Sequence, residues 1–87
     1  MSPKKRKKLE ILRKKLDKLD DSFISLIKKR TSLVTEVLKL KNYKYQIVDK
    51  NRINQILLRI KKKSIKNNID TRITKRIWKN MIWSYID

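Results

Sequence analysis

The chain of 87 residues contains no cysteine, histidine, glycine or alanine, and its one proline is Pro3. The absence of cysteine and histidine excludes disulfides, thiol nucleophiles, imidazole acid–base catalysis and the usual zinc ligands. The absence of glycine, and of any proline after Pro3, removes the residues that tight turns and β-hairpins normally require. We therefore expect an all-α protein of helices and polar loops, with no metal or other cofactor.

Long apolar segments are also missing. No apolar run approaches the length of about 20 residues that a membrane-spanning helix requires, and no signal-peptide core is visible. We therefore expect a cytoplasmic protein. The short chain predicts a single domain, residues 1–87, which buries only a modest core by itself, so pairing with a second copy is expected.

Positive charge dominates the composition. The 26 lysines and arginines outnumber the 8 acidic residues, which gives a net charge of +18. Such a charge is compatible with nucleic acid, an anionic membrane surface or an anionic substrate. The abundance of lysine, isoleucine and asparagine without alanine or glycine is also typical of AT-rich codons, so part of the charge reflects coding composition. Residues 1–8 form a basic tail that leads into the first helix.

The apolar pattern from Leu9 onward has the spacing of a long amphipathic helix. Steps of three and four residues alternate through Leu9, Leu12, Leu16, Leu19, Phe23, Leu26, Arg30, Leu33, Val37 and Leu40. This pattern predicts one helix of more than 30 residues, about 50 Å long at 1.5 Å per residue. A helix of that length cannot fold back on itself, so we expect a second subunit to cover its apolar stripe.

Two shorter helices are predicted in the remainder of the chain. Residues 42–48 break the pattern and predict a loop, and residues 61–68 separate the two helices. Asp49 and Asp70 are suitable N-caps. The apolar residues expected on their inner faces are Ile53, Ile56, Leu57 and Ile60, followed by Ile73, Ile77, Met81 and Ile82. Trp78, Trp83 and Tyr85 add aromatic side chains to the last helix.

Three cations of the first helix are candidates for binding an organic anion. Arg30 lies within the apolar stripe, and Lys41 follows 11 residues later, only about 20° away around the helix axis. A buried cation normally has a partner, although either stem could instead pack while its charge reaches water. Arg13 precedes Arg30 by 17 residues, or about 25 Å. An antiparallel partner helix could bring Arg13 of one subunit beside Arg30 of the other.

Asp49 and Arg52 occupy one face at the start of the second predicted helix, because they are three residues apart. Taken singly, Asp49 is a helix cap and Arg52 is a surface cation. Their order and spacing after Arg30 and Lys41 favour a common site.

These residues resemble the all-helical (AroQ-type) chorismate mutase family. The segment LRKKLDKLDDSFISLIKKR, residues 12–30, is similar to the family pattern LRxxIDxIDxxLxxLLxxR. The spacings from Arg13 to Arg30 and from Arg30 to Lys41 match the family, and DKNR, Asp49 to Arg52, resembles its DxxR motif. The resemblance covers nearly the whole chain from Leu9.

The resemblance implies an intertwined homodimer of three-helix subunits that rearranges chorismate to prephenate in aromatic amino-acid biosynthesis. Arg13 of the partner and Arg30 would each hold one substrate carboxylate, and Lys41 would donate to the ether oxygen. Asp49 and Arg52 would line the entrance and the side of the ring hydroxyl.

Two departures from the family pattern leave the reaction open. Ile53 stands where the mutases usually have a glutamate that accepts from the ring hydroxyl, and a glutamine of the family's last helix falls beyond Asp87. Tyr85 aligns where some members have serine. Isochorismate-pyruvate lyases resemble this chain in having an apolar residue after the arginine, and are the alternative. A basic nucleic-acid-binding helical protein is less favoured, because it would leave Arg30 and Lys41 unexplained.

Overall fold

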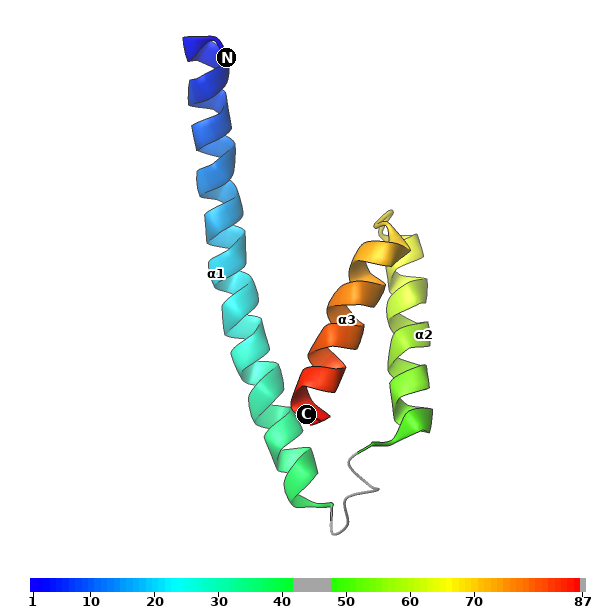
Figure 1. Ribbon diagram of the computed structural model, residues 1–87. Coiled ribbons are helices and arrows are strands. Elements are labelled where there is room, and N and C mark those ends of the chain that lie inside the picture. The colour runs from blue at the N-terminus through cyan, green and yellow to red at the C-terminus, as the bar shows by residue number, and fades with distance from the viewer. Residues whose placement is uncertain (42–47, 87) are drawn as a thin grey trace. The chain divides into compact units, whose positions relative to one another are not determined.

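The computed structural model describes residues 1–41 and 48–86, and these residues form three helices and no strand (Figure 1). The helices are α1, Pro3–Lys39, α2, Lys50–Lys66, and α3, Thr71–Ile86. The predicted all-α order of one long and two shorter helices is confirmed. Residues 42–47 of the predicted loop lie outside the described residues. Two compact units, Met1–Val37 and Leu38–Asp87, are described separately below.

The helix α1 begins at Pro3, earlier than its predicted start at Leu9. Ser2 caps it: its hydroxyl accepts from the Lys5 amide at 3.3 Å, and its carbonyl accepts from the Arg6 amide at 2.9 Å. Proline is well suited to the first helical position, because it needs no amide donor there. Most of the predicted basic tail is therefore helical.

The helix α1 contains no buried residue. Its predicted apolar stripe is exposed in the single chain; Leu19, for example, keeps 65% of its surface accessible. Packing of an apolar face normally supplies most of the stability of a helix in a protein. We therefore expect that α1 is stable in water only when its apolar stripe is buried against another surface.

The helices α2 and α3 lie side by side and antiparallel, and they have a small core of their own (Figure 1). The buried side chains are Ile56, Ile60 and Ile82, with Ile53, Leu57, Trp78 and Ile86 packed against them. Ser64 is also buried, with 2% of its surface exposed. Its hydroxyl donates to the Ile60 carbonyl at 2.6 Å and lies 2.6 Å from the Thr74 hydroxyl, so its polar atom is satisfied.

The inner face of α3 differs from the predicted one. Ile73 and Ile77 are 55% and 38% exposed, whereas Ile82 is buried and Trp78 is half-buried. Thr74, Trp78 and Ile82 follow one another at four-residue intervals and face α2, where the Thr74 hydroxyl lies 2.6 Å from that of Ser64. The prediction that Ile73 and Ile77 face the same core as Ile82 is therefore wrong for the single chain.

The turn between α2 and α3 uses asparagine where glycine is usual. Asn68 has a φ of 56°, in the left-handed region. The Ile69 amide donates to the Ser64 carbonyl at 2.8 Å, and the Asn68 amide donates to the Ile65 carbonyl at 3.2 Å. These two bonds form a Schellman motif, in which asparagine is the second choice after glycine. A chain without glycine can therefore still close a short helical hairpin.

Candidate active site

Arg13 and Arg30 both lie on α1, and they are too far apart to hold one small molecule within a chain. Their 17-residue separation corresponds to about 25 Å along the helix and about 100° around it. Arg13 is exposed and Arg30 is half-buried. Arg30 stands between Leu26 and Leu33 in the apolar stripe. A ligand that contacts both arginines would have to lie between two chains.

Lys41 lies just beyond the end of α1. Its amide donates to the Leu38 carbonyl at 3.1 Å, which continues the helical turn by one further bond. Lys41 is half-buried, unlike the preceding Leu40, which is 80% exposed. The prediction that Lys41 lies on the long helix is wrong, because α1 ends at Lys39; helical periodicity therefore does not fix the angle between Lys41 and Arg30.

Asp49 caps α2. One carboxylate oxygen accepts from the Arg52 amide at 3.0 Å, and its carbonyl accepts from the Ile53 amide at 2.9 Å. The first bond satisfies one of the amides that a helix leaves without partners at its start, and the second is the first i→i−4 bond of the helix. The cap fixes Arg52 in the first turn of α2, where its side chain is exposed. The predicted cap is confirmed.

Ile53 and Tyr85 lie at the same end of the hairpin as Asp49. The antiparallel arrangement places the end of α3 and the start of α2 at the same end of the hairpin, away from the turn (Figure 1). Ile53 is half-buried and packs against the core formed by Ile56, Ile60 and Ile82. Tyr85 is half-buried in the last turn of α3. The structure thus collects Asp49, Arg52, Ile53 and Tyr85 at one end of the α2–α3 unit.

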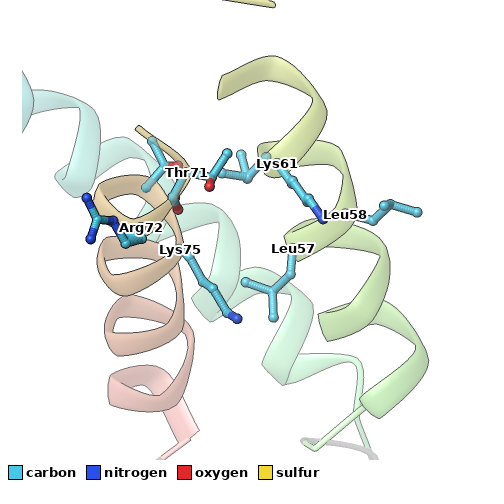
Figure 2. Close-up of a pocket in the computed structure, with 8 residues that line it drawn as sticks. Leu57, Leu58, Lys61, Thr71, Arg72 and Lys75 are labelled. Atoms are coloured by element: carbon cyan, nitrogen blue, oxygen red, sulfur yellow. Dashed lines mark hydrogen bonds between the residues drawn. The ribbon is translucent and has the colours of Figure 1, made fainter. Parts of the chain in front are cut away.

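A groove of about 420 Å³ lies between α2 and α3, toward the other end of the hairpin (Figure 2). Leu57 and Lys75 extend into it from facing helices, whereas Arg72 points away. Arg72 instead pairs with Asp70, with 2.9 Å between their charged atoms. None of the predicted site residues lines this groove.

The perturbed pKa values belong to the same end of the hairpin as the groove. Side-chain and backbone hydrogen bonds from Arg72 lower the pKa of Asp70, and the bond to Asp70 raises that of Arg72. Asp70 caps α3, because its carboxylate accepts from the Arg72 amide at 2.9 Å. This pair therefore stabilises a helix start.

Among the residues that the structure describes, no helix is long and apolar enough to cross a membrane. No cluster of acidic residues among them could hold a metal ion.

The buried pair of Ser64 and Thr74 was missed by the sequence analysis. Ser64 follows Ile60 by four residues, so it falls on the inner face of α2, where the apolar pattern has a gap. A polar residue at an inner position predicts a buried hydrogen bond, and this signal could have corrected the predicted face of α3.

The chain matches known proteins over most of its length. Residues 12–87 match the family described as chorismate mutase type II. The chain is also 36% identical over 76 residues to a chorismate mutase of Methanocaldococcus jannaschii, covering 86% of this chain and 77% of that protein. No solved structure matches it significantly. An enzyme of the isomerase class is thereby confirmed, and the chain belongs to the type II chorismate mutase family.

Proposed function

We propose that this protein is a homodimeric chorismate mutase that rearranges chorismate to prephenate. The observation that carries the proposal is the order of charged residues within a family match that spans residues 12–87. Arg13 and Arg30 lie on α1, Lys41 follows its end, and Asp49 and Arg52 begin α2.

The residues available suit this reaction. The rearrangement breaks a carbon–oxygen bond and forms a carbon–carbon bond within one molecule, so it needs no nucleophile and no proton transfer. The enzyme must hold a dianion in its reactive conformer and stabilise the negative charge that develops on the ether oxygen. Fixed cations can do both.

Each cation has a separate role in the proposal. Arg30 holds one carboxylate, and Arg13 of the second subunit holds the other. Lys41 donates to the ether oxygen, where an ammonium offsets the developing charge. Asp49 and Arg52 line the entrance and the ring-hydroxyl side, with Ile53 and Tyr85 beside them.

The dimer is part of the proposed site. Arg13 and Arg30 of one chain are about 25 Å apart, which is too far for a ligand of chorismate's size. An antiparallel pair of α1 helices places Arg13 of one chain beside Arg30 of the other. The same pairing covers the apolar stripe on which α1 has no buried residue.

The direct test is to mix the purified chain with chorismate and follow the loss of its ultraviolet absorbance, with prephenate identified as the product. Saturable turnover above the uncatalysed rate supports the proposal. A folded dimer that leaves chorismate unchanged refutes it.

Ile53 favours isochorismate-pyruvate lyase as the second candidate. Its side chain packs against the hairpin core and offers no acceptor to a ring hydroxyl. The same cations would hold isochorismate, whose hydroxyl lies elsewhere on the ring. Formation of salicylate and pyruvate from isochorismate, faster than prephenate from chorismate, would assign the lyase instead.

The proposed cellular role is synthesis of phenylalanine and tyrosine in the cytoplasm. Expression of the chain in a bacterial strain that lacks chorismate mutase should restore growth without these two amino acids. A lyase would not restore it, so this experiment also separates the two candidates.

A further inference from the structure

The first half of α1 divides its side chains among three faces. At 100° per residue, six lysines fall within an arc of about 120°, here called the lysine face. They are Lys4, Lys7, Lys8, Lys14, Lys15 and Lys18. The acids fall in a neighbouring arc, which also holds Arg6 and Arg13; the acids are Glu10, Asp17, Asp20 and Asp21. The leucines of the apolar stripe occupy the third arc, together with Lys5. Ile11 is the one apolar residue of this stretch within the lysine face.

The packing of the chain gives these lysines no role. All six are exposed, and none forms an ion pair within the described residues. Lys4, Lys7 and Lys8 lie in the first two turns of α1, whose first turn has no acid. The start of a helix is the positive end of its dipole, so cations there oppose helix formation. Local stability therefore does not explain them.

The proposed active site does not use the lysine face either. The family match begins at residue 12, after Lys4, Lys7 and Lys8. The α1 residues of the proposed site are Arg13 and Arg30, and both lie outside the arc of the lysine face. The face is also distinct from the leucine stripe that a second copy would cover in the proposed dimer.

We propose that the lysine face binds the phosphate backbone of double-stranded DNA without sequence preference. From Lys4 to Lys18 it extends about 21 Å along α1. One DNA strand presents a phosphate about every 3.4 Å of the duplex axis, so about six phosphates fall within this length, and the winding of the strand brings only some of them to a straight helix. Lysine is a compact point charge that suits contact with phosphates. Such binding leaves Arg30 and Lys41 to the substrate. DNA binding as a second activity therefore does not leave these two cations unexplained, as it would if it were the only function.

An anionic membrane fits the same helix less well. A bilayer would take up the leucine stripe, and the two borders of that stripe carry opposite charges. Lysines lie along one border, whereas four acids lie beside the other border together with Arg6 and Arg13, and these acids oppose attraction to anionic headgroups on that side. DNA meets only the lysine face.

The experiment uses the full chain and a fluorescein-labelled 20-base-pair duplex, with anisotropy measured between 50 and 200 mM NaCl. The test variant replaces the lysine face with glutamine: K4Q, K7Q, K8Q, K14Q, K15Q and K18Q. The matched control replaces six lysines of the hairpin, K61Q, K62Q, K63Q, K66Q, K75Q and K79Q, and so loses the same charge. Glutamine is a good helix former, and circular dichroism checks that both variants keep their helices.

We expect the test variant to lose at least tenfold in affinity at 100 mM NaCl, and the control to lose less than threefold. The dependence of log affinity on log salt should also become shallower by several units in the test variant, because each phosphate contact contributes about 0.9. Equal losses in both variants would overturn the proposal, as would no binding by the parent chain at 50 mM NaCl. Tighter binding to phosphatidylglycerol vesicles, lost in the test variant, would assign the face to membranes instead. Turnover of chorismate should be unchanged in the test variant.

Discussion

The two compact units of the chain differ in where their order comes from. The α2–α3 unit has buried isoleucines, a buried hydroxyl pair and capped helix starts. Met1–Val37, by contrast, has no buried residue, although it carries the most regular apolar pattern of the sequence. The packing of the hairpin is therefore determined by contacts between its own side chains. The apolar stripe of α1, by contrast, can be buried only by a partner outside its own unit. Of the cations proposed for the site, Arg13 and Arg30 belong to α1, whereas Arg52 belongs to α2.

The strongest test of this comparison is Leu19→Asp on the apolar stripe. Leu19 is 65% exposed in the single chain, and a change at such a position would alter the stability of a monomer by less than about 0.5 kcal/mol. In the proposed dimer, two copies of Leu19 are buried, each contributing about 1.5–3 kcal/mol. We therefore expect the dissociation constant to rise by at least about 100-fold, and turnover to be lost with the dimer.

Analytical ultracentrifugation with a parallel chorismate assay measures both effects. Ser22→Asp is the matched control, because it adds the same charge at an exposed position outside the stripe. A Leu19→Asp protein that sediments like the parent chain would show that α1 is not the dimer surface.

Arg30→Ala separates the role of α1 in the chemistry from its role in assembly. Loss of a fixed cation that holds a substrate carboxylate is expected to lower kcat/KM about a thousandfold. The dimer should survive, because the substitution leaves the leucines of the stripe in place. Steady-state kinetics measure the loss of kcat/KM, and sedimentation of the same sample measures whether the dimer survives. Lys29→Ala is the control for both measurements. Near-normal turnover in Arg30→Ala would remove Arg30 from the site.

The features of the fold that could be predicted from the sequence are the local ones. Asp49 and Asp70 were predicted as caps, and both accept amide hydrogens at helix starts. The early start of α1 was missed because Ser2 and Pro3 precede the apolar pattern, although together they form a good start signal. The face of α3 was predicted wrongly because it includes Thr74, whose hydroxyl is hydrogen-bonded with that of Ser64, and apolar periodicity carries no information on such a bond.

The proposed site is less accessible to prediction for a physical reason. The positions of Arg30, Lys41, Asp49 and Arg52 along the chain follow from spacing. Arg13 and Arg30 can approach each other only if they belong to different copies of the chain. Helical periodicity shows that they are too far apart within one chain, but it does not show how two copies pair. Composition was also a weak guide, because net charge alone does not separate the lysine face from the cations of the site.

Ile60→Ala tests whether the hairpin stands on its own core. Ile60 is buried between α2 and α3, and truncation of a buried isoleucine costs about 2–5 kcal/mol. We place the expected loss near 3 kcal/mol, because the core is small and can partly collapse. Urea denaturation measures it, with Ile65→Ala as the exposed control on the same helix. If Ile60→Ala instead abolished the dimer and left the unfolding midpoint of the hairpin unchanged, the contrast between the two units would fail.

The smallest expected effect is a pH dependence confined to the hairpin. Hydrogen bonds from Arg72 lower the pKa of Asp70 below its ordinary value of 3.8. A carboxyl group with a lower pKa in the folded state adds stability above its unfolded pKa and loses it as the pH falls through the folded value. The melting temperature of the parent chain should therefore fall more between pH 4 and pH 2 than that of Asp70→Asn, in which an uncharged asparagine keeps the cap. Asp21→Asn, on the acid-bearing face of α1, should follow the parent chain. If the pH profile of Asp70→Asn matched that of the parent chain, the Asp70–Arg72 pair would add nothing to the stability of the hairpin. Exposed ion pairs often contribute little, and both side chains of this pair are exposed.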